Sequence, residues 1–406
     1  MMSPLMLSRP RYPEAYEDAW RRMAMAELDM APDLPSTQFD ARLRPVAASL
    51  SDDLTVARAK GLEASSGGRV RPIAYGLYFF PQTWMRMALM MGEALARDPD
   101  LISSSRRDSS RPVRIVDLGA GAGAGTWGAL EALAAHRKPA AVEVWAVDRE
   151  AALLRRFERM AEVARQRFPL TLRVHTLVAD ARGIPEACPD PDLVLAVFSA
   201  NEWMTESDAA AWAAWGNGLA DRLAPQGALA LCEPASEASA AGIRAIRDDF
   251  CRGDRMRICW PCPHEQPCPM RGGKIGYCHE VRRWTPPPTV HRWGCALGRE
   301  IGVVKFSGLV AARKDPASAR PDSSDTPMRG RMVAPMGTAA GRLVTCVCAP
   351  DGQLHSCERL TRAMEREEIR SLRAWERGDS ISMEGRVLGD GLTWRAETWH
   401  RLVAWE

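Results

Sequence analysis

The stretch RIVDLGAGAGAGTWGAL, residues 114–130, decides the fold. An apolar run containing Asp117 leads directly into Gly119, Gly121 and Gly123, and a helical pattern follows. Glycine permits a tight turn and lets backbone N–H groups approach a ligand at the N-terminus of the next helix. A strand, a glycine loop and a helix in this order predict a nucleotide-type binding site; the alternative is a tight turn that holds no cofactor.

Further apolar runs follow the glycine loop, and helical patterns separate most of them. The five candidate strands are VRIVDLG (113–119), VEVWAVD (142–148), TLRVHTLVAD (171–180), DLVLAVFSA (192–200) and GALALCEP (227–234). Strand–helix alternation predicts an α/β domain with crossover units and a parallel sheet covered by helices on both faces. GVVKFSGLVAARK (302–314) is expected to add one or two strands to the same sheet.

Two acidic residues close the second and third candidate strands. Asp148 ends its strand where a carboxylate can accept the hydroxyls of a ribose. Asp180 follows the third strand, where an acidic residue can meet an adenine amino group. The order D-x-G-x-G-x-G, then an acid, then VAD resembles class I (Rossmann-like) S-adenosylmethionine-dependent methyltransferases. That resemblance implies S-adenosylmethionine as the cofactor. A dinucleotide dehydrogenase is the alternative, which the glycine spacing and Asp117 disfavour.

The segment FSANEWM, residues 198–204, follows the fourth candidate strand. Many nucleic-acid amino-group methyltransferases carry [DN]-PP-[YF] at this place. Asn201 and Glu202 are candidates to orient a methyl acceptor, and Trp203 to stack on a base. Since the Pro-Pro pair is missing, a binding fold that has lost its activity is the alternative to an enzyme.

A cysteine-rich loop is the second unusual feature. Five of the 11 cysteines fall between residues 251 and 278. In a reducing compartment such clustering indicates metal binding, and the prolines between the cysteines stiffen the loop. The alternative is a set of free buried thiols. A local ligand set for zinc or an iron–sulfur cluster comprises Cys259, Cys262, Cys268 and Cys278. A split set replaces Cys259 by Cys348, and the spacing does not decide between the two sets.

Two histidines, His264 and His279, lie close to these cysteines. They can hydrogen-bond to sulfur or replace a ligand. A backbone hydrogen-bond partner is the alternative for each.

The pattern C-P-H-x-x-x-C-P, then C-H, then C-x-P-[DEST]-G in a β-rich tail resembles the methyltransferase-like assembly proteins of the small ribosomal subunit, which occur in mitochondria and have bacterial relatives. The resemblance extends from YGLYFFPQTW (75–84) to VTCVCAPDGQL (344–354). It implies a [4Fe–4S] cluster, S-adenosylmethionine, and binding to the small ribosomal subunit and its rRNA, in assembly or by rRNA methylation. The implied ligands are Cys262, Cys268, Cys278 and Cys348. GYCHE (276–280) departs from the family pattern W-C-H-F-S.

The predicted organisation has four parts. They are an N-terminal helical region (1–110), a Rossmann-like domain (111–314) containing the cysteine-rich loop (251–295), a linker (315–330) and a small β-rich C-terminal domain (331–406). Within the first part, residues 49–65 and 81–100 have helical patterns.

Composition limits the classes of function. No apolar run of about 18 residues exists, so no membrane-spanning segment is expected. The N-terminus lacks the apolar region of a presequence, which predicts a cytoplasmic protein in a bacterium; a eukaryotic relative would lie in the mitochondrial matrix. The net charge of +3 does not point to a partner, but only five of the 54 basic residues are Lys. Arginine binds phosphate in bidentate fashion, although a GC-rich genome also explains this bias.

A monomer is expected when the protein is free. The competing hypothesis is a stand-alone methyltransferase that carries zinc or an iron–sulfur cluster and acts on a small molecule. A radical enzyme is disfavoured, because its usual C-x3-C-x2-C spacing differs from the x5 and x9 spacings here.

Overall fold

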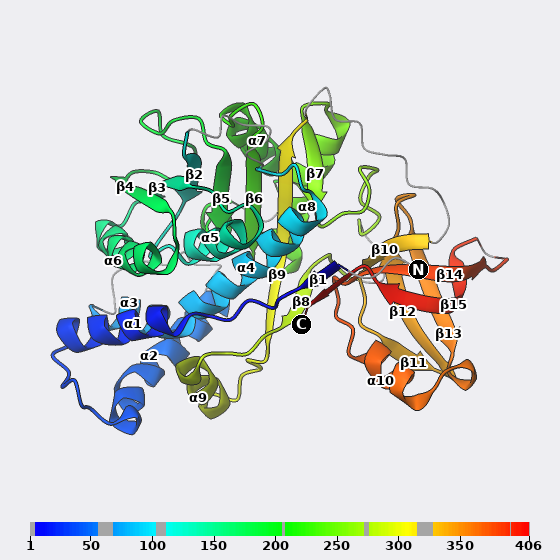
Figure 1. The fold of residues 1–406 in the computed structure, drawn as a ribbon, viewed down its shortest axis with the longest axis horizontal. Coiled ribbons are helices and arrows are strands. Elements are labelled where there is room, and N and C mark those ends of the chain that lie inside the picture. Colours follow the sequence, from blue (N-terminus) through cyan, green and yellow to red (C-terminus); the bar gives the residue numbers. More distant parts are fainter. Residues whose placement is uncertain are drawn as a thin grey trace.

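The computed structural model describes residues 5–55, 68–102, 111–204, 208–271, 276–314, 328–389 and 391–405. Within these ranges the chain forms N-terminal helices, a central sheet with helices on both faces, and a β-rich C-terminal domain beside the sheet (Figure 1). No helix in these ranges is long and apolar enough to cross a membrane. Most of the expected linker, and the end of the helix expected at 49–65, lie outside the described residues.

The central sheet has the order β4-β3-β2-β5-β6-β9-β7. Its strands are β2 (Val113–Leu118), β3 (Ala141–Asp148), β4 (Thr171–Val178), β5 (Leu193–Val197), β6 (Ala228–Glu233), β7 (Met256–Trp260) and β9 (Val303–Arg313). All pairings from β4 to β6 are parallel, whereas β9 is antiparallel to both of its neighbours, β6 and β7. This doubly wound order with an antiparallel strand between the last two parallel ones is the class I methyltransferase fold, so the fold prediction is confirmed.

Helices cover the two faces of this sheet. They are α5 (Ala124–His136), α6 (Ala151–Arg167), α7 (Ala209–Asp221) and α8 (Glu237–Arg252). Successive side chains of a strand point to opposite faces, so Ile115 packs in the core that contains α5 and α6. Its neighbour Val116 packs in the core beneath α7 and α8. Burial on both faces explains why the central strands β2, β5 and β6 are almost continuously apolar, whereas the edge strand β4 is not.

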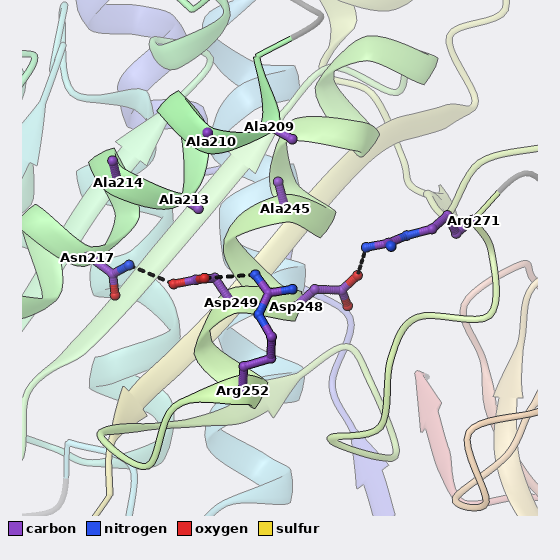
Figure 2. Close-up of a pocket in the computed structure, with 10 residues that line it drawn as sticks. All are labelled: Ala209, Ala210, Ala213, Ala214, Asn217, Ala245, Asp248, Asp249, Arg252 and Arg271. Carbon is purple, nitrogen blue, oxygen red and sulfur yellow. Dashed lines mark hydrogen bonds and ion pairs between the residues drawn. The ribbon is translucent and has the colours of Figure 1, made fainter.

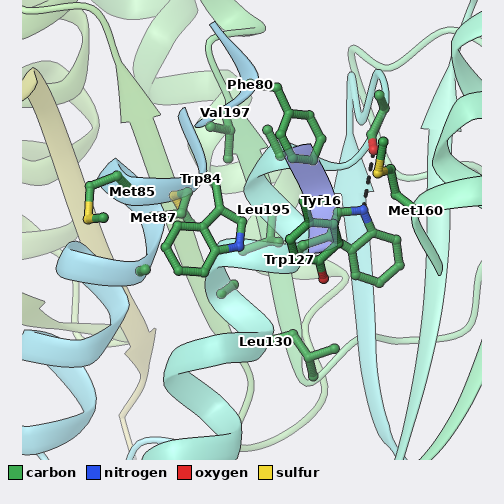
Figure 3. Packing of buried hydrophobic residues seen from close by; sticks show 14 of the residues in the cluster. Tyr16, Phe80, Trp84, Met85, Met87, Trp127, Leu130, Met160, Leu195 and Val197 are labelled. Carbon is green, nitrogen blue, oxygen red and sulfur yellow. Dashed lines mark hydrogen bonds between the residues drawn. The ribbon is translucent and has the colours of Figure 1, made fainter. Parts of the chain in front are cut away.

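The N-terminal helices pack on the α5 face. They are α1 (Glu14–Glu27), α2 (Ser36–Thr55), α3 (Val70–Tyr78) and α4 (Phe80–Arg97). The helix expected at 81–100 is thus confirmed as α4. Its close approach to α5 depends on Gly128, where a Cβ would lie 2.3 Å from the carbonyl oxygen of Trp84. Figure 3 shows Trp84, Trp127 and Phe80 in this core.

The expected start of α2 is wrong. The helix begins at Ser36 and passes through Pro45 rather than starting near residue 49. Proline in a helix interior normally indicates a break, which misplaced the boundary. Here Leu43, Ala47 and Leu50 form a buried stripe on both sides of the proline, and tertiary packing keeps the helix continuous.

The C-terminal domain is a six-stranded sheet of order β10-β14-β15-β13-β12-β11. Its strands are β10 (Met328–Met332), β11 (Gly337–Ala339), β12 (Arg342–Cys348), β13 (Leu354–Leu360), β14 (Ser380–Val387) and β15 (Thr393–Arg401). The helix α10 (Arg366–Arg373) packs on a small core of its own that includes Leu372 and Trp399. The two ends of the chain also meet, because β1 (Leu5–Leu7) pairs in parallel with β16 (Val403–Trp405).

Two short elements precede β9 in the chain. The strand β8 (Glu280–Arg283) pairs antiparallel with the first part of β9, and α9 (Pro288–Ala296) follows it. The cysteine-rich loop lies between β7 and β8 and faces the C-terminal domain.

Candidate functional site

The glycine loop lies at the carboxyl edge of the sheet, between β2 and α5. Gly119, Gly121 and Gly123 all have positive φ, at 73°, 54° and 89°. The backbone N–H of Gly121 donates to Oδ2 of Asp148 over 2.8 Å, and the N–H of Glu150 donates to Oδ1 of the same carboxylate over 2.8 Å. The structure therefore brings the three glycines and Asp148 together.

Asp117 lies beneath this loop and is 1% exposed. Burial raises the pKa of Asp117 to about 7, with a further contribution from the Asp148 charge and an opposing one from Thr126. The Thr126 hydroxyl donates to Oδ2 of Asp117 over 2.5 Å. Oδ1 is buried and has no hydrogen-bond partner in the protein. An unpaired buried acceptor is costly, so this oxygen is suited to a donor that arrives with a ligand.

Asp180 occupies a more peripheral position, just beyond β4. Its side chain is 69% exposed, and Oδ1 accepts the backbone N–H of Arg182 over 3.0 Å. The N–H of Ala179 donates to the carbonyl oxygen of Asp148 over 3.1 Å, which places the end of β4 beside the end of β3. Asp180 thus lies on the same edge as the glycine loop.

The segment after β5 is fixed by contacts with other side chains of the protein. Phe198 adopts a positive φ of 57°, and the guanidinium of Arg86 lies 4.9 Å from its ring centre. In the amide orientation that matches its neighbours, Asn201 donates to the Phe198 carbonyl oxygen over 3.2 Å and to Glu233 Oε2 over 2.7 Å. Glu202 is an ion-pair partner of Arg149 at 3.5 Å. Asn201 therefore has a structural role that the sequence did not reveal.

Trp203 packs against protein rather than standing free for a base. Its ring is edge-on to Trp215, with centres 6.3 Å apart.

The four cysteines that the family resemblance implies as ligands lie close together at the boundary between the two domains. Buried Cys348, at the end of β12, packs in a small cluster to which Cys268 and Cys278 contribute from the other domain. Cys262 lies close enough to influence the ionisation of all three. Cys259 instead packs in the core on the α5 face of the central sheet, with Arg257 Nη1 3.2 Å from its sulfur. The gathered residues thus include the split set, and Cys346 of β12 packs against the same cluster.

Burial dominates the chemistry of these thiols. The pKa values of Cys268 and Cys278 are both raised to about 11, mainly by burial and with a smaller contribution from neighbouring cysteines of the set. Burial likewise raises the pKa of Cys348 well above its usual range, followed by the effects of Cys262, Cys278 and Cys268. Within the described residues, no group of three or more His, Cys, Asp or Glu side chains is arranged to hold a single metal ion.

A model of one protein family covers most of the chain. It matches residues 69–381, from α3 to β14, and its description is "Mitochondrial small ribosomal subunit Rsm22". The chain belongs to the Rsm22 family. The glycine loop, Asp148, Asp180 and all four gathered cysteines lie within the matched residues. No curated protein matches the sequence.

Solved structures resemble the chain only distantly. A putative class I S-adenosylmethionine-dependent methyltransferase from Listeria monocytogenes is 12% identical, with a TM-score of 0.34, over 76% of this chain and 91% of its own. The plantazolicin methyltransferase BpumL is 9% identical, with a TM-score of 0.33, over 69% and 99%. PH0851 is 18% identical, with a TM-score of 0.30, over 50% of this chain and only 43% of its own.

A hydrogen-bond network supports the cysteine-rich loop of this Rsm22 family member. Arg247, in the second half of α8, donates to the carbonyl oxygens of His264 (2.7 Å) and Gln266 and to Oδ1 of Asp248 (2.8 Å). Oδ1 of Asp248 also accepts the N–H of Cys268 over 3.2 Å. Sequence analysis missed this network, because Arg247 and Asp248 look like ordinary residues of an amphipathic helix.

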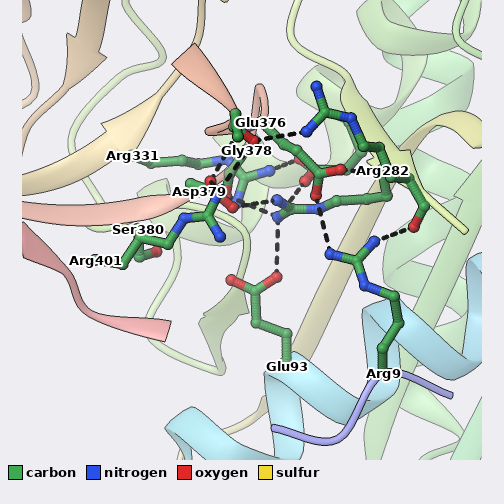
Figure 4. A network of polar contacts seen from close by, with 12 residues as sticks. Arg9, Glu93, Arg282, Arg331, Glu376, Gly378, Asp379, Ser380 and Arg401 are labelled. Atoms are coloured by element: carbon green, nitrogen blue, oxygen red, sulfur yellow. Dashed lines mark hydrogen bonds and ion pairs between the residues drawn. The ribbon is translucent and has the colours of Figure 1, made fainter. Parts of the chain in front are cut away.

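A buried ion network joins the two domains beside the cysteines (Figure 4). Arg282 of β8 is 2% exposed in its side chain and lies 3.0 Å from Glu93 of α4, 2.9 Å from Asp379 and 2.7 Å from Glu280. Arg331 of β10 also contacts Glu280. No local sequence signal marks these partners, which are up to 189 positions apart.

A surface groove of about 470 Å³ lies between α7 and α8 (Figure 2), and no residue of the glycine loop lines it. Alanines form much of its lining, and Asn217, Asp249, Arg252 and Arg271 supply polar groups. Arg271 also ion-pairs with Asp248 at 2.9 Å, which connects the rim of the groove to the cysteine-rich loop.

Proposed function

We propose that this protein is a methyltransferase-like factor of the small ribosomal subunit that binds S-adenosylmethionine at its glycine loop, binds the subunit's rRNA, and carries a [4Fe–4S] cluster between its domains. It acts in assembly of the subunit, either as an rRNA methyltransferase or as an escort without catalysis. The observation that carries the proposal is the match of residues 69–381 to a small-ribosomal-subunit family.

The glycine loop fits the methyl donor. Each oxygen of Asp148 already accepts one backbone N–H and retains a further acceptor site for a ribose hydroxyl. The unpaired Oδ1 of Asp117 is available to a ligand-side donor beneath the loop. Asp180 lies at the outer end of the same edge, where the adenine amino group is expected.

Bound S-adenosylmethionine supplies an activated methyl group, so the protein mainly positions the acceptor and removes a proton. Asn201 is committed to Phe198 and Glu233 and thereby fixes the shape of the acceptor loop. Glu202, paired with Arg149, is the carboxylate of this loop proposed to orient an acceptor. This arrangement supports acceptor binding more directly than it supports proton transfer.

The four gathered cysteines fit an iron–sulfur cluster by the chemistry of their donor set. Iron–sulfur clusters are commonly held by four Cys thiolates. Burial, together with the neighbouring cysteines, raises the pKa values of the Cys268, Cys278 and Cys348 thiols and so favours their protonated forms. Positive iron would offset the repulsion between the ligands when they are deprotonated. Because Cys348 comes from the C-terminal domain, cluster binding would also stabilise the association of the two domains.

Ribosome association is tested by co-sedimentation of the purified protein with small ribosomal subunits. We expect binding at low salt that weakens steeply as salt rises, because arginine contacts to phosphate release counterions. Asp148→Ala should weaken S-adenosylmethionine binding about 10- to 100-fold in calorimetry and retain subunit binding. Absence of co-sedimentation at low salt would contradict the proposal.

Catalysis is tested separately with a radiolabelled methyl donor and small subunits that lack the modification. Label in the rRNA that disappears with Asp148→Ala supports the methyltransferase function. Subunit binding without label supports the escort function.

A further inference from the structure

His264 connects the cysteine-rich loop to the C-terminal domain. Its side chain is 5% exposed, and Nε2 lies 3.2 Å from the sulfur of Cys348, a residue 84 positions away. The turn that follows Cys348 packs on the same loop, since a Cβ on Gly352 would lie 2.6 Å from Cβ of Gln266. The imidazole thus lies at the contact between the two domains.

The contact of Nδ1, on the other side of the His264 ring, determines which ring nitrogen carries the proton. Nη2 of Arg247 lies 3.2 Å from Nδ1 of His264 and 2.7 Å from its carbonyl oxygen. A guanidinium only donates hydrogen bonds, so Nδ1 must accept and cannot carry a proton. The proton of the neutral ring is therefore on Nε2, directed at the sulfur of Cys348.

Arg247 is itself held in place, which makes the ring orientation specific. Nη1 donates to Oδ1 of Asp248, and Oδ2 of Asp248 accepts from Arg271 over 2.9 Å. The guanidinium and the imidazole are both buried. The chain of contacts runs from α8 through Arg247 and His264 to Cys348.

We propose that His264 is a positioning residue for Cys348: its Nε2–H donates to the sulfur and orients this ligand. This inference rests on the cluster proposed above, because it assigns a role toward that group. Hydrogen bonds to ligand sulfurs make reduction of an iron–sulfur cluster easier, and partners of a ligand strengthen metal retention. His264 therefore favours both reduction of the cluster and its retention.

His279 provides a matched control. It follows Cys278 directly in the sequence, yet its Nδ1 faces the carbonyl oxygen of Tyr277 over 3.1 Å. A carbonyl only accepts, so Nδ1 of His279 carries the proton. The two histidines are thus expected in opposite tautomers.

The first test is nitrogen NMR of the histidine rings, in protein as purified and after removal of iron. We expect the Nε2–H form for His264 and the Nδ1–H form for His279, with resonances assigned by His264→Ala and His279→Ala. The Nδ1–H form at His264 would overturn the inference, whether or not a cluster is bound.

The second test compares the reduction potential and the rate of iron loss to a chelator. His264→Ala should shift the midpoint potential to more negative values and accelerate iron loss about 10-fold or more. His264→Gln, which keeps an N–H donor, should restore part of both, and His279→Ala should change neither. Equal potentials and iron-loss rates in His264→Ala and wild type would overturn the inference. Absence of iron and sulfide from wild type would contradict the proposed cluster and with it any effect of His264 on a reduction potential. The tautomer measured by NMR would still show whether His264 donates a hydrogen bond to Cys348.

Discussion

The glycine loop and the domain interface are built in opposite ways. The loop comes from one continuous stretch, residues 114–130, and its partner Asp148 ends the adjacent strand. The interface joins residues that are far apart in the chain, such as Arg282 with Asp379 and His264 with Cys348. A local motif reveals its geometry from spacing alone, whereas an interface requires knowledge of the fold.

The interface also shows that two separate devices hold the domains together. One is the gathered thiols with His264, and the other is the buried ion network around Arg282. The first would depend on iron, and the second does not. Their effects on stability should therefore be separable.

The largest expected effect comes from Arg282→Met. It removes the buried arginine that Glu93, Glu280 and Asp379 share. Each carboxylate keeps a second partner, Arg97, Arg331 and Arg401 respectively, so the expected cost is at most roughly 3–5 kcal/mol of unfolding free energy. Chemical denaturation measures the loss. Affinity for S-adenosylmethionine should stay within a few-fold, because the glycine loop is a separate region.

Arg283→Met is the control on the same strand. Its guanidinium is exposed and donates to the carbonyl oxygen of Ala374, so the expected loss is below about 1 kcal/mol. Equal losses in the two variants would show that the buried network does not hold the interface.

An intermediate effect is expected from Gly119→Ala, which alters the glycine loop rather than the domain interface. The new Cβ would lie 2.6 Å from Cβ of Ser199, at a φ of +73°. Overpacking of this kind costs about 1–3 kcal/mol. Affinity for S-adenosylmethionine should fall at least about 10-fold by calorimetry, since each 1.4 kcal/mol is a factor of ten, while iron content should not change.

Gly121→Ala separates overpacking from backbone strain. Its φ is +54°, but a Cβ there meets no atom within 4 Å, so only about 1 kcal/mol of strain is expected. If Gly121→Ala weakened binding as much as Gly119→Ala, close packing against Ser199 would not be the cause.

The last comparison removes single carboxylates at the loop edge, and the smallest effect is expected at Asp180. Asp148→Ala should weaken S-adenosylmethionine binding about 10- to 100-fold, the range for a hydrogen bond to a charged group. Asp180→Ala should weaken it by less than about 5-fold, because the 69% exposed Asp180 side chain is screened by water. A larger effect at Asp180 would mean that the adenine end dominates recognition.

Sequence reasoning located much of the sheet. The five runs nominated as strands correspond to β2–β6, and residues 302–314 contain β9, since buried parallel strands are continuously apolar. The gathering of Cys262, Cys268, Cys278 and Cys348 followed from a family resemblance, because spacing left the local and split sets equal.

Other features were not predictable from local patterns. The pairing of β1 with β16 joins the two ends of the chain, and no short-range signal encodes it. The roles of Asn201 and Arg247 depend on partners brought close by folding: Glu233 lies on a neighbouring strand, and His264 on a loop beyond β7. Such contacts follow from topology rather than from residue type.

The most direct measurement is the iron and acid-labile sulfide content of anaerobically purified protein, for wild type, Cys348→Ser and Cys346→Ser. Cys346 lies two residues before Cys348 on β12 and serves as the matched control. The account predicts stoichiometric iron and sulfide in wild type and in Cys346→Ser, and their loss in Cys348→Ser. Full retention of iron by Cys348→Ser, or zinc in place of iron in wild type, would contradict a [4Fe–4S] cluster shared between the two domains.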